Sequence, residues 1–167
     1  TPVLSIPEGT LETFWYNSSM SKYQFVVGRK NDNFTSLSQY KEGILQLNKL
    51  FDQFLEKDET QFINPFNSAA IVIAINNKEK EPVRGFACLS IIQQDKHGEL
   101  DSAYVRPKDT NQGLWSSMMD ALIRESDKMG VKELMALPAW GDEFLEKPLQ
   151  KRGFEKQTDG NEMWRRR

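Results

Sequence analysis

The chain has 167 residues, of which 38% are apolar and 28% charged, and its 22 basic and 24 acidic side chains leave a formal charge of −2. This length suits a single domain with a buried core, predicted to span residues 1–167, and the composition excludes extended disorder and collagen-like repeats. The near-neutral charge provides no general excess of cations for nucleic-acid binding.

One cysteine and one histidine exclude an internal disulfide and a zinc site built from Cys and His. Cys88 lies in the apolar run 86–89 and is interpreted as a buried, inert thiol. His97 falls in a polar segment that is typical of a hairpin turn, so we interpret it as an exposed bystander rather than a general base. We therefore expect no metal.

Membrane and export signals are weak in this sequence. The longest strongly apolar run, residues 69–75, is too short to span a bilayer, and residues 1–13 lack the basic and apolar segments of a signal peptide. We expect a cytoplasmic protein with neither membrane nor nucleic acid as a partner, and a homodimer is left open.

The first half of the chain predicts a strand at residues 23–27 and a helix over residues 35–57. Ser36 and Gln39 fit a capping box for this helix, and apolar residues follow at spacings of three and four. Residues 69–75 have no polar side chain and are rich in β-branched residues, as in a strand buried on both faces in the middle of a sheet.

The middle of the chain predicts strands at 84–92 and 99–106, which form an antiparallel meander with the central strand. Pro107 ends the last of them. Apolar spacing then predicts a helix over residues 113–128 that ends at a glycine, and a strand over residues 131–139.

The C-terminal part predicts a helix over 142–152, which Pro148 should kink or divide. Residues 154–157 and 162–166 flank Asp159-Gly160, a pair that favours a hairpin turn. With a helical N-terminal part before the meander, the fold class is α+β, with a mixed, mostly antiparallel central sheet flanked by helices.

Residues 99–119 resemble the coenzyme A loop of the GNAT acyltransferase superfamily. The family has an acidic strand ending in Val-x-Pro, then Arg/Gln-x-x-Gly-x-Gly/Ala opening a helix, and Gly113 stands at the first glycine of that pattern. Residues 149–155 resemble the family's Tyr-x-Lys-x-Gly-Phe-x segment. The likeness covers residues 68–158 and implies a GNAT-like fold with acetyl-CoA as co-substrate and no metal.

A phosphate site at this loop has a physical basis. A helix N-terminus has N–H groups without intrahelical partners and the positive end of the macrodipole, so a tight turn at Gly113 could hold a pyrophosphate on backbone donors, with Ser116 or Ser117 adding a hydroxyl. The residues also allow Gly113 simply to start a packing helix. The expected coenzyme-binding residues are Ala103, Val105, Thr110, Asn111, Gln112, Gly113, Leu114, Trp115 and Ser116.

Strand alternation places Glu99, Asp101, Ala103 and Val105 on one face of the strand before Pro107, unless a bulge intervenes. The resemblance implies that backbone N–H groups near Ala103 and Val105 face the thioester, and that a carboxylate at Glu99 is the general base, with Asp101 as the second candidate. An ammonium cannot attack a thioester until a base removes its proton. The alternative is that both carboxylates are ordinary exposed residues of a half-solvated sheet.

Three residues depart from the family pattern: Thr110 replaces Arg or Gln, Trp115 replaces Gly or Ala, and Leu149 replaces a Tyr that protonates the leaving thiolate in many members. We expect Trp115 to point into the core rather than at the phosphates. Leu149 cannot donate a proton, so an enzyme of this sequence needs water or another residue for that step.

The favoured function is an N-acyltransferase that moves an acetyl group from acetyl-CoA directly to a primary amine of a small molecule or protein. Two alternatives remain: a noncatalytic GNAT-fold binding or regulatory module, and an unrelated α+β domain. Segments 62–66 and 139–143 would contact the acceptor, and their aromatic and acidic residues are compatible with a cationic amine.

Overall fold

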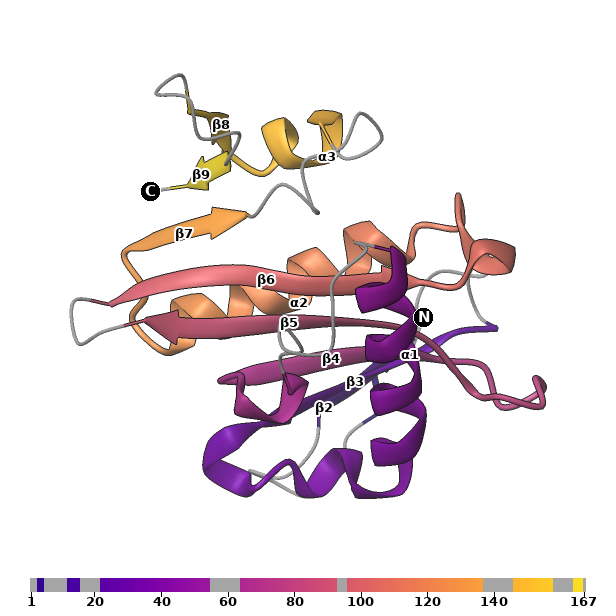
Figure 1. The fold of residues 1–167 in the computed structure, drawn as a ribbon. Coiled ribbons are helices and arrows are strands. Elements are labelled where there is room, and N and C mark those ends of the chain that lie inside the picture. Colours follow the sequence, from indigo (N-terminus) through magenta and orange to yellow (C-terminus); the bar gives the residue numbers. More distant parts are fainter. Residues whose placement is uncertain are drawn as a thin grey trace.

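The computed structural model of the chain describes residues 3–4, 12–15, 22–54, 64–92, 96–136, 146–157 and 164–166. Within these residues nine strands form one sheet in the order β1-β2-β3-β4-β5-β6-β7-β9-β8. All neighbouring strands pair antiparallel except β6 and β7, which pair parallel. The predicted α+β class with a mixed, mostly antiparallel sheet is confirmed (Figure 1).

The N-terminal part contributes three strands to the sheet: β1 (Val3–Leu4), β2 (Glu12–Trp15) and β3 (Gln24–Arg29). The expected strand at residues 23–27 is β3, shifted slightly along the chain, and the expected helix follows it. The strands β1 and β2 were not expected, so the part before the meander is not only helical. The strands β1 and β2 are short and owe their order to pairing outward from β3, which no local periodicity in the sequence reveals.

The helix expected over residues 35–57 divides into a 3-10 helix, η3 (Thr35–Tyr40), and the α-helix α1 (Lys41–Phe54). The predicted capping box was wrong: the Ser36 hydroxyl donates to the backbone carbonyl of Val27 at 2.9 Å. The Ser36 hydroxyl, which the local pattern assigned to the helix N-terminus, is therefore hydrogen-bonded to β3 instead. Residues 55–57 lie outside the described part of the chain.

The predicted meander is confirmed as β4 (Ala70–Ile75), β5 (Val83–Ile92) and β6 (His97–Val105). All six residues of β4 are buried in the middle of the sheet, and Cys88 on β5 is fully buried, as expected. The prediction that His97 is an exposed residue of the turn was wrong: it is the first residue of β6 and is half-buried.

Two helices cover the two faces of the sheet (Figure 1). On one face α1 packs Ile44, Leu47 and Phe51 against the strands, and on the other α2 (Leu114–Lys128), the predicted helix, packs Met118 and Leu122. No helix among the described residues combines the length and the apolar character needed to cross a bilayer.

The C-terminal part adds β7 (Glu133–Ala136), α3 (Glu146–Lys151), β8 (Glu155–Lys156) and β9 (Trp164–Arg166). Pro148 does not kink or divide α3, because it lies in the first turn, where a missing N–H costs no helical hydrogen bond. The pairing of β8 with β9 confirms the predicted hairpin strands. The expected turn at residues 159–160 and the expected segments 137–139 and 142–145 lie outside the described residues.

A buried ion pair links α2 to β3. The Arg29 guanidinium donates to both oxygens of Glu125, with Nη2 at 2.9 Å from Oε2, and the Glu125 side chain is only 2% exposed. Burial acts to raise the pKa of Glu125, but Arg29 and the neighbouring Lys128 outweigh it and leave the pKa below its ordinary value. The carboxylate therefore stays ionised inside the fold because Arg29 is present.

We predict that Arg29→Met lowers the free energy of unfolding at pH 7 by about 3 to 5 kcal/mol, because it leaves a buried charge without its partner. A carboxyl with a lowered pKa stabilises the fold above its unfolded pKa and loses that contribution as the pH falls through the folded pKa. The difference between wild type and variant should therefore shrink on acidification. Urea denaturation at pH 7 and at pH 4 measures it; a difference that does not depend on pH would contradict this account of the pair.

Candidate functional site

The strand β7 pairs with only the first part of β6. Among the described residues, parallel pairing joins His97–Leu100 to Glu133–Ala136, where β7 ends, while β6 continues to Val105. The chain then passes from this far end of β6 to α2 (Figure 1). The β7-side edge of β6 from Asp101 to Val105 therefore has no strand partner among the described residues.

Two backbone N–H groups of β6 point to that edge. The N–H of Arg106 donates to the Arg84 carbonyl at 3.0 Å, so at this end of the strand alternate residues point their backbone groups toward β5. Ala103 and Val105 occupy the intervening positions, and their N–H groups are directed to the other edge, which no ladder of the described residues covers. Their side chains are buried under α2, so only their backbone is available to a ligand.

A β-bulge at Asp101 changes the predicted faces of β6. Cys88 pairs with Ser102 but Leu89 pairs with Leu100, so Asp101 is an extra residue on this strand. Glu99 and Asp101 share the α1 face, as predicted, while Ala103 and Val105 lie on the α2 face together with Leu100. The prediction that all four alternate residues share one face was wrong, because the bulge reverses the alternation between Asp101 and Ala103.

The two carboxylates have different surroundings. The Ser90 hydroxyl donates to Oδ2 of Asp101, while Oδ1 is buried and has no hydrogen-bond partner among the described residues. Burial and, to a lesser degree, the charge of Glu99 raise the pKa of Asp101, against the lowering effect of the Ser90 hydrogen bond. The Glu99 side chain is 24% exposed, and its Oε1 lies 3.6 Å from His97 Nε2. The raised pKa of Asp101 and its unpartnered oxygen make it a candidate proton acceptor.

The loop between β6 and α2 turns sharply just before the helix. Asn111 and Gly113 both have positive φ angles, of 63° and 80°, and Gly113 precedes the first helical residue. The first intrahelical bond runs from the Ser117 N–H to the Gly113 carbonyl at 3.1 Å, so the N–H groups of Leu114, Trp115 and Ser116 lie ahead of it. This is the donor-rich helix start that the sequence predicted.

Hydroxyl groups near this turn are mostly committed to the protein itself. Ser117 is buried and its hydroxyl donates to the Gly113 carbonyl at 2.7 Å, so it cannot serve a ligand at the same time. The Thr110 hydroxyl donates to the Pro107 carbonyl at 2.9 Å. Ser116 is half-buried at the helix start and is the remaining serine for the expected role, beside the half-buried Gln112.

The apolar residues of the predicted site serve the core. Leu114 is 1% exposed, and Trp115 is half-buried and packs against the core cluster under α2, as expected. Leu149 is fully buried in the same cluster. These side chains help to fix the position of α2 and α3, and those of Leu114 and Leu149 offer a ligand no polar atom.

Sequence reasoning missed a buried polar cluster beneath the loop. The Asp109 carboxylate accepts from the Tyr23 hydroxyl at 2.6 Å and from Arg84 Nε at 2.9 Å, and all three residues are at most 6% exposed. Asp109 lies 86 positions from Tyr23 and 25 positions from Arg84 along the chain, and the three residues come from different parts of the fold. No local pattern could have joined them.

Comparison with known proteins agrees with this geometry. A family model described as "Acetyltransferase (GNAT) family" matches residues 37–146. The chain belongs to the GNAT acetyltransferase family. The comparison with curated proteins found no match for this member of the family.

Solved structures share the GNAT fold at low sequence identity. A GNAT acetyltransferase from Staphylococcus aureus has a TM-score of 0.62 and 15% identity, over 85% of this chain and 98% of that one. Tetrahymena GCN5 has a TM-score of 0.60 and 15% identity, over 79% and 90%. A GNAT acetyltransferase from Elizabethkingia anophelis, solved with acetyl-CoA bound, has a TM-score of 0.55 and 16% identity, over 73% and 88%.

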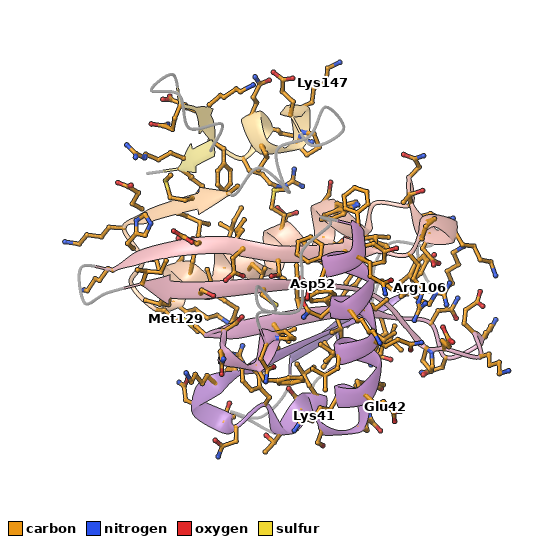
Figure 2. All side chains as sticks on the ribbon, in the orientation of Figure 1. Lys41, Glu42, Asp52, Arg106, Met129 and Lys147 are labelled. Carbon is orange, nitrogen blue, oxygen red and sulfur yellow. The ribbon has the colours of Figure 1, made fainter. Side chains whose placement is uncertain are left out.

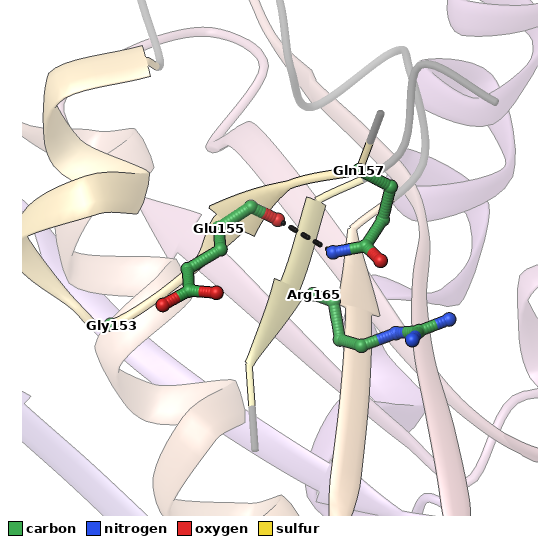
Figure 3. Close-up of a pocket in the computed structure, with 4 residues that line it drawn as sticks. All are labelled: Gly153, Glu155, Gln157 and Arg165. Carbon is green, nitrogen blue, oxygen red and sulfur yellow. Dashed lines mark hydrogen bonds between the residues drawn. The ribbon is translucent and has the colours of Figure 1, made fainter. Parts of the chain in front are cut away.

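Two other kinds of site, a metal centre and a cavity, can be compared with the predicted site residues of this GNAT chain. Among the described residues no group of three or more His, Cys, Asp or Glu side chains could hold a metal ion. A cavity of about 380 Å³ is lined by Gly153, Glu155, Gln157 and Arg165 (Figure 3). It lies at β8 and β9, across β7 from β6, and none of the predicted site residues lines it.

The segments expected to contact the acceptor lie largely outside the described residues, which include only 64–66 of them. The last turn of α1 adds Asp52, which is 8% exposed, on the helix that covers the Glu99 and Asp101 face (Figure 2). A third carboxylate therefore lies on the α1 side of the sheet, with Glu99 and Asp101.

Trp115 tests whether the helix start is crowded. Because its ring packs against the core, we predict that Trp115→Ala lowers the free energy of unfolding by about 2 kcal/mol, less than for a fully buried ring, and leaves the affinity of the folded protein for CoA within about threefold of wild type. Chemical denaturation and calorimetric titration measure the two quantities. Clearly tighter binding by the variant would show that the ring obstructs the site.

Proposed function

We propose that the chain transfers an acetyl group from acetyl-CoA directly to a primary amine of a small molecule or protein. The observation that carries the proposal is the edge of β6 that has no strand partner among the described residues, followed along the chain by the start of α2. The N–H groups of Ala103 and Val105 point to that edge, and those of the first turn of α2 come after the loop. An extended thiol with a pyrophosphate at one end suits these two sets of donors.

The fit to acetyl-CoA rests mainly on backbone atoms. The turn at Asn111 and Gly113 directs the first N–H groups of α2 outward, where they would bind the pyrophosphate with Gln112 and Ser116 nearby. The N–H groups of Ala103 and Val105 would hold the pantetheine arm and the thioester. This division of roles explains why Thr110 and Trp115 can replace the residues common in the family.

Asp101 is the better candidate for the general base, ahead of Glu99, which the sequence favoured. Its raised pKa lies closer to neutrality than that of an ordinary aspartate, and proton transfer is most efficient when the pKa of the base is near the working pH. Its buried Oδ1 has no hydrogen-bond partner among the described residues, so an incoming amine would satisfy it. Glu99 would add negative charge that attracts an ammonium ion.

The chemistry follows from these positions. Asp101, directly or through water, takes a proton from the acceptor ammonium, and the neutral amine nitrogen attacks the thioester carbon to form a tetrahedral intermediate. The N–H of Ala103 stabilises its oxyanion, a contribution of about 3 kcal/mol for one donor. The carbon–sulfur bond breaks, and the second proton of the nitrogen passes through water to the thiolate, since Leu149 has none to give, while Asp101 returns its proton to solvent.

The second candidate, a noncatalytic GNAT-fold binding or regulatory module, is favoured by Leu149. This residue stands where many family members have a tyrosine, and it is fully buried in the core. A chain that had lost the acid for the thiolate but kept the helix start would bind CoA without turnover. Acetyl transfer to a panel of primary amines at saturating acetyl-CoA separates the two functions.

Binding of CoA is tested first by thermal stability. A ligand that binds only the folded state stabilises it by about 2.7 kcal/mol at roughly 100 times its Kd. Gly113→Glu should abolish this effect, because it places a side chain at a positive φ and a negative charge at the helix start. Gly130→Glu is the matched control: Gly130 has a φ of 74° beyond the other end of the same helix.

We expect Gly130→Glu to be destabilised like Gly113→Glu but to keep its response to CoA. Equal responses of the two variants would exclude the α2 N-terminus as the phosphate site. A wild-type melting temperature that does not change across millimolar CoA would overturn the binding proposal itself.

If Asp101 is the base, substitutions of its two neighbours should move the pH profile of kcat/KM in opposite directions. The Glu99 charge raises the pKa of Asp101 and the Ser90 hydrogen bond lowers it. Glu99→Gln should therefore move the acidic limb of the kcat/KM profile to lower pH, and Ser90→Ala should move it to higher pH.

Asp101→Asn should lower kcat/KM by roughly 10² to 10⁴ without changing CoA affinity.

These profiles are measured on an acceptor found by the amine panel, at saturating acetyl-CoA. If Glu99→Gln shows the large loss and Asp101→Asn does not, Glu99 is the base. If both variants retain wild-type rates with chemistry rate-limiting, neither carboxylate removes the proton.

A further inference from the structure

The loop that would bind the pyrophosphate is anchored by the side-chain carboxylate of one of its own residues. Asp109 belongs to the 3-10 turn η6 (Pro107–Asp109), two residues before Asn111 and four before Gly113. It is 3% exposed, although a turn at the end of a strand usually directs its acidic residues to solvent. A buried carboxylate of this kind needs hydrogen-bond or ionic partners within the fold.

Two residues from other parts of the sheet bind the Asp109 carboxylate. Tyr23, next to the start of β3, donates its hydroxyl to Oδ1, and Arg84 on β5 binds Oδ2 through Nε at 2.9 Å and Nη2 at 2.8 Å. Burial, together with the hydrogen bond to Asp109, raises the pKa of Tyr23, so its hydroxyl remains a donor. Hydrogen bonds to charged groups are about twice as strong as neutral ones, and those of Asp109 are shielded from water.

The other polar contacts of this region differ in burial. Arg106, labelled in Figure 2 where β6 ends, is 12% exposed; its Nε donates to the Val83 carbonyl at 3.0 Å, and it pairs with Glu81, which is 51% exposed. These contacts fix the end of β6, before the loop. Within the loop, Lys108 pairs with Glu79 at 3.1 Å, and the Lys108 side chain is 72% exposed. An exposed pair of this kind contributes little, so the Asp109 cluster is the buried polar restraint inside the loop itself.

We infer that Asp109 is a positioning residue for acetyl-CoA: held by Tyr23 and Arg84, it fixes the loop so that the turn at Asn111 and Gly113 presents the α2 N–H groups to the pyrophosphate. This inference rests on the proposed function. Asp109 does not touch the ligand. Its negative charge, so close to a phosphate site, is tolerated because Arg84 neutralises it inside the protein.

The charge of Asp109 makes the inference sharply testable. Asp109→Asn keeps the size of the side chain but leaves the Arg84 cation without its counter-charge near the bound anion. Electrostatics alone would therefore tighten the binding of CoA. A role in positioning predicts the opposite, because a loop that is no longer held presents its donors less often, and a small misplacement can cost roughly 10²-fold.

The experiment compares three probes by calorimetric titration: CoA, its nucleotide half 3′-phosphoadenosine 5′-diphosphate, and acetyl-pantetheine. For Asp109→Asn we expect CoA and the nucleotide to bind roughly 10-fold to 100-fold more weakly, and acetyl-pantetheine to bind as to wild type, because it uses the β6 edge. Tyr23→Phe removes one hydrogen bond and should weaken nucleotide binding in the same direction by a smaller factor.

Two control variants separate positioning from general destabilisation and surface charge. Arg29→Met breaks the buried pair with Glu125, away from the loop, and Lys108→Ala removes an exposed charge on the loop itself. Both should bind the nucleotide within about threefold of wild type at a temperature where all the proteins are folded. Arg29→Met matches Asp109→Asn in kind, because each change leaves one buried charge unpaired.

The outcomes are distinct. If Asp109→Asn binds the nucleotide as tightly as wild type or more tightly, the inference is wrong while the proposed function stands. Equal weakening by Arg29→Met would likewise overturn it, since the effect would then follow stability alone. Should Asp109→Asn not fold, Tyr23→Phe decides, and unchanged nucleotide binding by that variant overturns the inference. A wild-type protein that binds no CoA overturns the proposed function instead.

Discussion

The extra residue at Asp101 determines what each face and each edge of β6 can do. Without it, regular alternation would place Asp101 and Ala103 on the same side of the sheet. With it, the carboxylates face α1, while Ala103 and Val105 bury their side chains under α2. The strand therefore presents acidic side chains on one face and backbone donors along one edge, which is the separation that an acyl donor and an amine acceptor need.

The end of pairing between β6 and β7 has the second structural consequence. A parallel pair normally hides the backbone of both strands. Here the pairing ends at Leu100 and Ala136 among the described residues, and beyond it β6 keeps only β5 as a partner. The loop that follows, which connects this edge of β6 to the start of α2, is held by the buried Asp109. Most of this proposed site is backbone, and its precision depends on side chains that never touch the ligand.

The strongest predictions from sequence were those carried by local chemistry. The unbroken apolar run in β4, the glycine ahead of α2 and the apolar stripe of α2 each depend on residues close together in the chain, and each was found in its place. The expected roles of Leu114 and Trp115 in packing follow from the same stripe. A family resemblance at residues 99–119 then located the region that the structure makes open.

Features that depend on distant residues could not be predicted. The bulge follows from how β6 aligns with β5, so alternation alone misplaced Ala103 and Val105. The Ser36 hydroxyl is bound by β3 instead of capping a helix, and His97 joins β6 because β7 lies beside it. The cluster of Tyr23, Arg84 and Asp109 unites three elements and has no sequence signature.

A crystal structure of the chain with acetyl-CoA tests the central claim most directly. The account predicts the pyrophosphate within hydrogen-bond distance of the backbone N–H groups that follow Gly113, and the thioester carbonyl bound by the N–H of Ala103 at the β7-side edge of β6. Electron density for the ligand at the cavity of Glu155 and Arg165, or anywhere that leaves the α2 N-terminus and the β6 edge without contact, would contradict it.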